Sequence, residues 1–304
     1  MVPRLSKAFE IQRLRVLVEV ARLGSVSKAA EALGLTQPTV SLHLKALNTT
    51  LGVPVVERQG RGIRLTESGH LLEHHARRAL AELERAQQAL ESQRDLSKGS
   101  LRVGAGISVG TYLFPEIVKD FSEQHPSIEL RVEVGADNDV ADLLKRGELH
   151  LGVLSGVGNH PDLEARDITA HPLVAVVGPG YAGASKGKMS KEQLRDATLL
   201  ARRNGSETQR LADIYLAGMR VKPAGRWGFD TPEAINGAAK AGLGVALVSE
   251  LTVRRELRDG ELVKVNFAGA KAPPSVPVQV VRSVHHAPSP AERAFLELLE
   301  SRIA

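Results

Sequence analysis

The stretch SVSKAAEALGLTQPTVSLHLKALNTTLGVPVVERQGRGIRLT, residues 25–66, contains two short helical patterns separated by Gly34. Ser25 and Ser27 are candidate caps for the first pattern, because their hydroxyls accept hydrogen bonds from free N–H groups at a helix start. The alanines that follow are small enough to let two helices cross closely. Gly34 suits the end of this helix, since glycine adopts the left-handed conformation without strain. The stretch therefore predicts two short helices joined by a tight turn.

The second pattern begins after Thr36, a further candidate cap, and repeats apolar residues at helical spacing. These apolar residues are Val40, Leu44, Leu47 and Leu51. The outward positions of its first half are Gln37, Thr39, Ser41, Leu42 and Lys45. Pro38 fits the first turn, where its missing N–H costs nothing. A helix presented in this way fits the major groove of B-DNA, where Gln, Thr and Ser bond base edges or phosphates.

Residues 53–58 and 62–65 alternate around the turn Gln59-Gly60-Arg61-Gly62, which predicts a two-stranded wing. Arg58, Arg61 and Arg64 are candidates for contacts with phosphates or a minor groove. An upstream apolar helix supplies the third helix of the core, with Leu14, Leu17, Val18 and Ala21 at helical intervals. A small helical bundle with a solvated polar face is the alternative interpretation, and the basic wing argues against it.

Positive charge is concentrated in the same region. Residues 1–66 hold ten Lys or Arg and four Glu, a net charge of +6, whereas the whole chain of 304 residues carries +5. The remainder is therefore close to neutral, at −1. This asymmetry indicates one module that faces DNA on an otherwise ordinary globular body.

Residues 25–47, followed by Leu51-Gly-Val-Pro and Arg64-Leu-Thr-Glu-Ser-Gly, resemble the N-terminal domain of LysR-type transcriptional regulators. The resemblance implies that Gln37, Pro38, Thr39 and Ser41 line the DNA-facing end of a recognition helix, and that Arg61 or Arg64 touches the neighbouring backbone or minor groove. The predicted DNA-binding residues are Ser25, Gln37, Pro38, Thr39, Ser41, Lys45, Arg58, Arg61 and Arg64.

The sequence departs from the family pattern at three places. Leu42 stands where many members have a basic residue, Asn48 replaces the usual Glu, and Val55-Val56 replaces a Leu-Phe pair. The first departure puts one phosphate or base contact in doubt. The other two change packing or a local ion pair, and apolar exchanges in a core usually cost little when the volume is shared out elsewhere.

A long helical pattern from residue 67 to about 95 carries a heptad seam, with apolar residues alternately four and three apart. The predicted dimerisation residues are Leu72, Ala76, Ala79, Leu83, Ala86 and Leu90. A single amphipathic helix packed on its own domain is the alternative from the pattern alone. The resemblance favours a dimerising linker helix, so that two readers meet two half-sites of an inverted repeat.

After the polar hinge at residues 97–100, short apolar strands alternate with helical segments. Expected strands cover 101–105, 127–134 and 149–154, with helices at 112–124 and 137–146 between them, an order that implies a parallel sheet. The alternation restarts with strands at 173–177 and 198–201, helices at 208–217 and 232–241 and a strand at 245–248. A strand near 276–282 and a helix at 290–303 close the chain.

The expected fold is therefore α/β overall: a winged helix-turn-helix, a long linker helix and a two-lobed α/β domain like that of periplasmic binding proteins. The predicted domains are a DNA-binding domain at 1–66, a linker helix at 67–97 and an effector-binding domain at 98–304. Lobe I is expected at about 100–167 and 272–304, and lobe II at about 168–271.

Two α/β lobes enclose a cleft, and open sheets bind ligands beyond the carboxyl ends of their strands. Ser108 and Thr111 lie between the first strand and its helix, Ser206 at the matching place in lobe two, and Thr231 before a later helix. Helix N-termini with hydroxyls favour anions, and the equivalent positions of the family line the effector pocket. Ser108, Thr111, Ser206 and Thr231 are the predicted effector-binding residues. Ordinary N-caps are the competing interpretation.

Two enzyme classes compete with a regulator. Residues 106–110 spell G-x-S-x-G between a strand and a helix, the setting of a hydrolase nucleophile. No earlier strand of that module supplies an oxyanion hole, and His285-His286 are the only late histidines available as a base. A dinucleotide loop at Gly104, Gly106 and Gly110 lacks the third glycine of the standard spacing. A two-lobed solute-binding protein would have no use for residues 1–95.

Composition excludes several other classes. The chain has no cysteine, which excludes a disulfide or thiol switch. The adjacent histidine pairs 74–75 and 285–286 diverge, so we expect no metal site. No segment approaches the roughly twenty apolar residues of a membrane span, and the N-terminus lacks a signal core. We expect no cofactor and a cytoplasmic protein.

These observations predict a regulator rather than an enzyme. Its expected partners are double-stranded DNA and a second copy of the chain, as a dimer through the linker helix, with RNA polymerase as a further candidate. The resemblance to LysR-type regulators implies a tetramer. A small-molecule effector, expected to be anionic, would bind in the lobe cleft and change how the paired readers sit on promoter DNA.

Overall fold

The computed structural model describes residues 9–59, 62–94, 99–158, 160–182, 187–202, 206–284, 286 and 288–303. Two compact units make up the chain. One is Met1–Arg94 with Arg146–Glu148, and the other is Asp95–Lys145 with Leu149–Ala304. Each unit has hydrophobic cores of its own.

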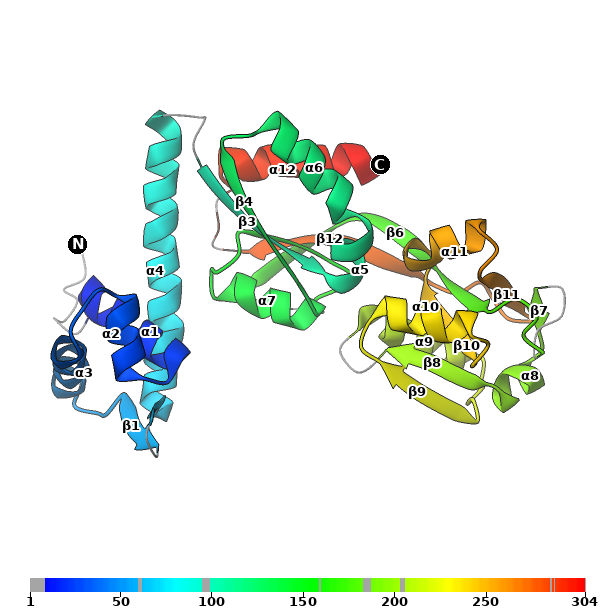
Figure 1. Cartoon of the computed structure of the whole chain (residues 1–304), viewed down its shortest axis with the longest axis horizontal. Coiled ribbons are helices and arrows are strands. Elements are labelled where there is room, and N and C mark those ends of the chain that lie inside the picture. Colours follow the sequence, from blue (N-terminus) through cyan, green and yellow to red (C-terminus); the bar gives the residue numbers. More distant parts are fainter. Residues whose placement is uncertain are drawn as a thin grey trace. The chain divides into compact units, whose positions relative to one another are not determined.

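The first unit is a three-helix core followed by a hairpin and a long helix (Figure 1). Its elements are α1 (Ile11–Leu23), α2 (Val26–Ala32), α3 (Gln37–Leu51), β1 (Val56–Gln59), β2 (Gly62–Leu65) and α4 (Glu67–Arg94). The predicted caps form: Ser25 Oγ accepts from the Lys28 N–H at 3.4 Å, and Thr36 Oγ1 accepts from the Thr39 N–H at 3.3 Å. Gly34 is left-handed, with φ of 63°. These local signals set the tight turn between α2 and α3.

The hairpin is held against the helices by backbone contacts. Ile63 N–H donates to the carbonyl oxygen of Gly24 at 3.2 Å, which ties β2 to the turn after α1. The first strand begins at Val56 and not at residue 53 as predicted. Pro54 has no N–H to contribute to a ladder, and the N–H of Val55 donates to Asn48 Oδ1 at 2.9 Å. Asn48, one of the three departures from the family pattern, thus holds the turn that precedes the wing.

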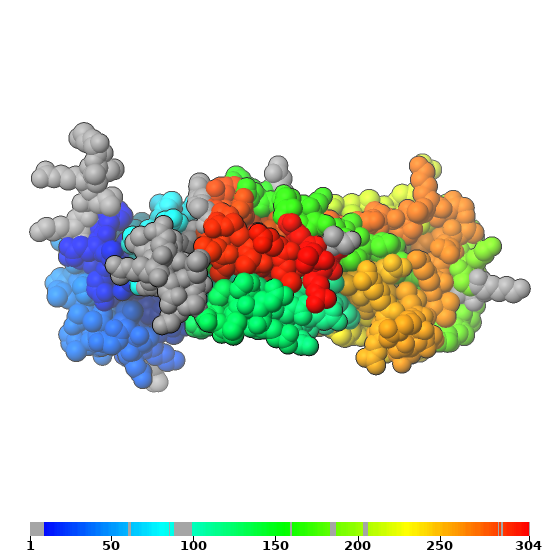
Figure 2. Space-filling model, turned by 90° about the horizontal axis from the view of Figure 1, so that it is seen from above, coloured from blue at the N-terminus to red at the C-terminus, as the bar shows by residue number. Residues whose placement is uncertain are grey.

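The second unit is built on a ten-stranded sheet with the order β4-β3-β5-β12-β6-β10-β8-β9, to which β11 and β7 attach through β6. Strands β3 (Gly99–Gly106), β4 (Ile128–Gly135) and β5 (Leu151–Leu154) are parallel. The helices of this half, which we call lobe I, are α5 (Ile107–Tyr112), α6 (Phe114–Gln124), α7 (Asp137–Lys145) and α12 (Pro290–Ile303). They cover both faces of the three strands, and α12 lies beside α6 (Figures 1 and 2).

The other half, lobe II, repeats this plan. Its strands are β7 (Lys188–Met189), β8 (Thr198–Arg202), β9 (Gly225–Phe229), β10 (Val245–Ser249) and β11 (Val263–Phe267). Its helices are α8 (Lys191–Asp196), α9 (Glu207–Gly218), α10 (Pro232–Lys240), the 3-10 helix η2 (Glu250–Val253) and α11 (Arg254–Arg258). Two long strands, β6 (Leu163–Val177) and β12 (Ser275–Ser283), pair with each other and run between the lobes.

Two parts of the second unit differ from the prediction. The helix expected at residues 112–124 is α6, which begins at Phe114, and the short helix α5 before it was not predicted. Pro115 cannot donate the backbone bond that a continuous helix requires at this point, so the chain starts a new helix. The strand expected at 173–177 is only the end of β6, and nine of the first ten residues of that strand pair with β12. Polar residues in that part hide the strand pattern.

Candidate DNA interface and effector pocket

The N-terminal half of α3 presents a polar surface. Val40, Leu44 and Leu47 are buried in the core cluster. The predicted contact residues that are exposed on this helix are Gln37, Pro38, Ser41 and Lys45. Thr39 is half-buried, and its hydroxyl lies 2.8 Å from that of Thr36 at the cap. Ser25 is half-buried and caps α2, so its hydroxyl already has a partner.

The wing arginines lie on opposite faces of the hairpin. Glu57 pairs with Arg64 in the strand register and Arg58 with Ile63, so the two arginine side chains leave the ribbon on different sides. Both are exposed, and Arg64 Nε donates to Glu57 Oε1 at 2.6 Å. Arg61 lies outside the described residues. To contact a phosphate, Arg64 would have to break this ion pair with Glu57. An exposed ion pair contributes little free energy, so breaking it costs little.

The seam of α4 divides into two parts. Ala76 is buried and Leu72 packs against the core of its own unit, next to α1. The seam residues beyond them are exposed: Ala79, Leu83 and Ala86. Leu83 is 50% exposed. The side chain of Leu90 lies outside the described residues. The first turns of this helix thus complete the hydrophobic core of the first unit, whereas the apolar seam residues of the later turns are exposed to solvent.

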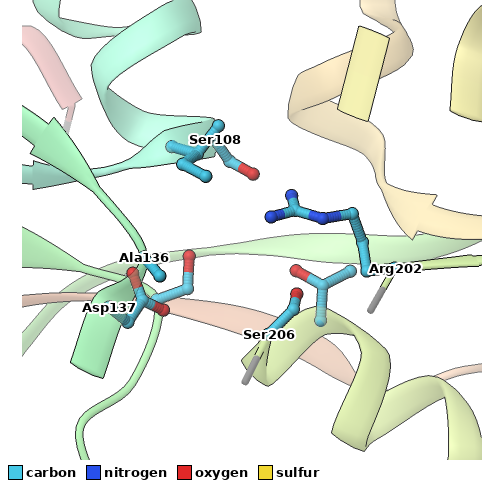
Figure 3. Close-up of a pocket in the computed structure, with 8 residues that line it drawn as sticks. Ser108, Ala136, Asp137, Arg202 and Ser206 are labelled. Atoms are coloured by element: carbon cyan, nitrogen blue, oxygen red, sulfur yellow. The ribbon is translucent and has the colours of Figure 1, made fainter. Parts of the chain in front are cut away.

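A small cavity lies between the lobes, at the carboxyl ends of their strands. Its lining residues are Ile107, Ser108, Ala136, Asp137, Ser155, Arg202, Ser206 and Thr208. The volume open to the centre of a water molecule is about 40 Å³, which is room for a few waters or a small ligand group. Lobe I contributes the residues that follow β3, β4 and β5, and lobe II contributes the end of β8 and the start of α9. Figure 3 shows Arg202 reaching from lobe II toward Ser108.

The charged groups of the cavity perturb one another. The pKa of Asp137 is raised to about 7, mainly by burial. The hydrogen bond from the Ser155 N–H and the charge of Arg202 limit this rise, and the carboxylate of Glu207 adds to it. Burial lowers the pKa of Arg202, which nearby carboxylates partly restore. Its Nε is buried without a hydrogen-bond partner. The cavity is therefore lined by one cation, three serines, one threonine and a carboxyl group that stays largely neutral below pH 7.

Side chains from the two lobes also meet beside the cavity. A Cβ added to Gly156 of lobe I would lie 2.9 Å from Glu207 Cγ of lobe II. Tyr112 of α5 interacts with Glu233 at the start of α10, and burial together with this carboxylate raises the pKa of Tyr112. The two lobes thus contact each other at these residues.

The structure brings together two of the four predicted effector residues, Ser108 and Ser206. Thr111 and Thr231 are exposed and do not line this cavity. Ser206 and Thr231 are N-caps of α9 and α10. Ser108 does not precede its helix as predicted, because α5 begins at Ile107 and Gly106 is its N-cap.

Sequence reasoning missed Asp137, Ser155 and Arg202. Arg202 is the last residue of β8, Ser155 directly follows β5, and Asp137 lies two residues beyond the end of β4. A search for polar residues at all strand ends, rather than for hydroxyls alone, would have found them.

Packing explains the glycines of residues 104–110. A Cβ at Gly106 would lie 2.1 Å from Asp137 Oδ1, and one at Gly104 would lie 2.4 Å from Val140 Cγ1. A Cβ at Gly110 would lie 2.6 Å from Val134 Cγ1. The spacing that resembles a hydrolase or dinucleotide motif thus reflects the close approach of β3 and α5 to neighbouring elements.

Two family descriptions match most of the chain. Residues 11–70 match "Bacterial regulatory helix-turn-helix protein, lysR family", and residues 94–304 match "LysR substrate binding domain". The chain belongs to the LysR family. It is a DNA-binding transcriptional regulator with an effector-binding domain, and its partner is double-stranded DNA. The predicted α/β fold, with its helix-turn-helix and two-lobed domain, is confirmed.

Similar proteins agree with this assignment. The transcriptional regulator CfxR of Cupriavidus necator is 33% identical over 263 residues, which cover 86% of this chain and 83% of that protein. CbnR, solved in complex with target DNA, has a TM-score of 0.66 at 22% identity and covers 96% of this chain and 99% of its own. The regulatory domain of CcmR from Synechocystis PCC6803, solved with 2-PG, has a TM-score of 0.61 at 22% identity. That match covers 68% of this chain and 98% of the domain.

The family assignment sets aside the hydrolase and dinucleotide alternatives, because the relatives are transcriptional regulators and not enzymes. Within the described part of the chain, no helix combines the length and apolarity needed to cross a membrane. The same residues contain no cluster of three or more His, Asp or Glu able to hold a metal ion.

Proposed function

We propose that this regulator senses a small anion in the cavity between its lobes and converts its binding into a change in lobe closure that alters promoter occupancy. One observation carries the proposal: the guanidinium of Arg202 from lobe II and the hydroxyl of Ser108 from lobe I line the same cavity (Figure 3). A ligand that binds both groups favours one separation of the lobes over others, which is the differential affinity that allostery requires.

The chemistry of the lining supports an anion. Arg202 is the cation of the described lining, and a carboxylate or phosphate would give its buried Nε the hydrogen-bond acceptor it lacks. Ser108 and Ser206 add hydroxyl donors. Asp137, with a pKa of about 7, is protonated in mildly acidic solution and can donate a hydrogen bond to an anion rather than repel it. The 2-PG complex of the CcmR domain supports a small-molecule ligand in this type of domain.

The test measures anion binding to the full-length protein with inorganic phosphate and 2-PG as probes. The chain has one tryptophan, Trp227 of β9 in lobe II, whose fluorescence reports on the effector domain. We expect Arg202→Gln to weaken binding at least about tenfold, the usual effect of losing a charged hydrogen bond. Arg255→Gln is the matched control, because Arg255 is 84% exposed on α11. Equal binding by wild type and Arg202→Gln would refute the site.

Coupling is tested by linkage. A bound anion that changes the affinity for promoter DNA by some factor must have its own affinity changed by DNA by the same factor. If a saturating anion alters neither DNA affinity nor transcription, the cavity binds a ligand without sensing it.

We propose further that α3 and the wing contact DNA through the nine predicted residues, and that the domain limits are those predicted, 1–66, 67–97 and 98–304. The exposed polar half of α3 supports the first point, and the separate hydrophobic cores support the limit between the linker helix and the effector-binding domain. We infer that two chains pair through the exposed stripe on α4, which includes Leu83, to read an inverted repeat. Tetramers and contact with RNA polymerase, both at promoter DNA in the cytoplasm, are the expected further steps.

A further inference from the structure

Leu42 projects from the middle of the DNA-facing side of α3. Its side chain is 65% exposed, although it lies between Val40 and Leu44, which are buried. Two residues along an α-helix correspond to a rotation of about 200°, so Leu42 lies almost directly opposite the core-facing stripe. It is absent from the hydrophobic cluster that includes Val40, Leu44 and Leu47. Packing within this domain therefore gives no reason for a leucine at this position.

Two exposed neighbours of Leu42 carry hydrogen-bonding groups, and a third is a proline. Ser41 precedes it, Pro38 lies one turn before it and Lys45 lies about one turn after it, and all three are exposed. A serine or lysine side chain bonds equally well to water, phosphates or base edges. Leucine has neither donor nor acceptor, so in a groove it gains free energy only from apolar contact.

The major groove offers one apolar group on its base edges, the C5-methyl group of thymine. A leucine placed over adenine, guanine or cytosine would remove donors or acceptors from water without replacing their hydrogen bonds, which is unfavourable. The chemistry at this position thus discriminates among base pairs, although the side chain makes no hydrogen bond.

We infer that Leu42 is a specificity-determining residue that recognises a thymine methyl group in each half-site of the operator. The inference rests on the proposal that α3 contacts base edges, and it adds the identity of one base. A basic residue at the same place would contact a phosphate or guanine instead, so this regulator would differ in operator preference from members that carry one.

The experiment uses full-length protein and a duplex selected by it from random double-stranded DNA, at one fixed salt concentration because affinity depends steeply on salt. Each thymine in turn is replaced by uracil, which lacks only the C5-methyl group. At one position in each half-site we expect uracil to weaken binding about fourfold, equivalent to ~0.8 kcal/mol for one buried methyl group.

Three variants complete the test. Leu42→Ala should bind the thymine and uracil duplexes equally, and Leu42→Arg should shift the preference at that base pair toward guanine. Lys45→Ala is the matched control, because loss of a charge should weaken binding to both duplexes by the same factor. Unchanged thermal unfolding of all variants would show that the exposed side chain has no folding role.

The outcomes separate the two ideas. The Leu42 inference is overturned if no thymine shows a methyl effect, or if Leu42→Ala keeps the wild-type ratio, while Gln37→Ala still weakens specific binding. If Gln37→Ala and Leu42→Ala both leave specific binding intact, the proposal that α3 contacts bases fails as well.

Discussion

Replacing Asp137 with Asn should change how the stability of the effector domain depends on pH. Asp137 is 8% exposed at the start of α7, and its pKa is raised from an ordinary 3.8 to about 7, mainly by burial. The unfolded chain releases this proton near pH 4, whereas the folded chain holds it until about pH 7. The stabilisation that the protonated Asp137 gives to the folded state is therefore fully present below pH 4. It is lost as the pH rises from about 4 to about 7, and the contribution does not change further above that pH.

The magnitude follows from the size of the shift. Three pKa units correspond to about 4 kcal/mol between the acid and alkaline limits, of which about 2 kcal/mol falls between pH 5.5 and pH 8. Asn cannot ionise, and its side-chain oxygen can still accept from the Ser155 N–H. The free energy of unfolding of Asp137→Asn relative to wild type should therefore rise by about 2 kcal/mol over this interval.

The assay is urea unfolding of the full-length proteins at pH 5.5 and pH 8, followed by the fluorescence of Trp227, which reports on the effector domain alone. Only the difference between the two proteins is compared, so that the titration of other groups cancels. A difference that is the same at both pH values would refute the raised pKa, and with it the view that this carboxyl group is neutral when the cavity accepts an anion.

Three further changes probe the N-terminal unit. Gly69→Ala should abolish DNA binding and destabilise this unit by about 3 kcal/mol or more, since the new Cβ would lie 1.9 Å from the carbonyl oxygen of Val55. Circular dichroism would detect the lower unfolding temperature of this unit. If the unfolding transition followed by Trp227 shifted by the same amount, the effect would not be local to this unit. Asn48→Ala should cost about 1 kcal/mol, because the Val55 N–H loses its partner; an unchanged midpoint of thermal unfolding would show that this bond is dispensable. Leu83→Asp should shift a dimer toward monomer in sedimentation experiments, because a charge replaces an exposed apolar side chain on the proposed seam; an unaltered association constant would place the dimer contact elsewhere.

Local signals were enough to predict much of the DNA-binding unit. Thr36, Gly34 and the stripe that includes Val40 and Leu44 act within one or two helical turns, and the helices they predict form in the structure. The last helix was predicted with the limits it has, Pro290–Ile303, because a proline start and helical spacing are both local. By contrast, α5 was not predicted, because six residues are too few to show a helical period.

The sequence by itself determined the family, the helices of the first unit and most of the strands and helices of the second, because hydrophobic period, caps and turns depend on neighbouring residues. Only the tertiary structure decided the cavity between the lobes. Ser108, Asp137 and Arg202 come from three strand ends in two lobes, and only the sheet order and the crossing of β6 and β12 bring them together. The raised pKa of Asp137 likewise depends on burial and on Glu207 of the other lobe, neither of which any local pattern records.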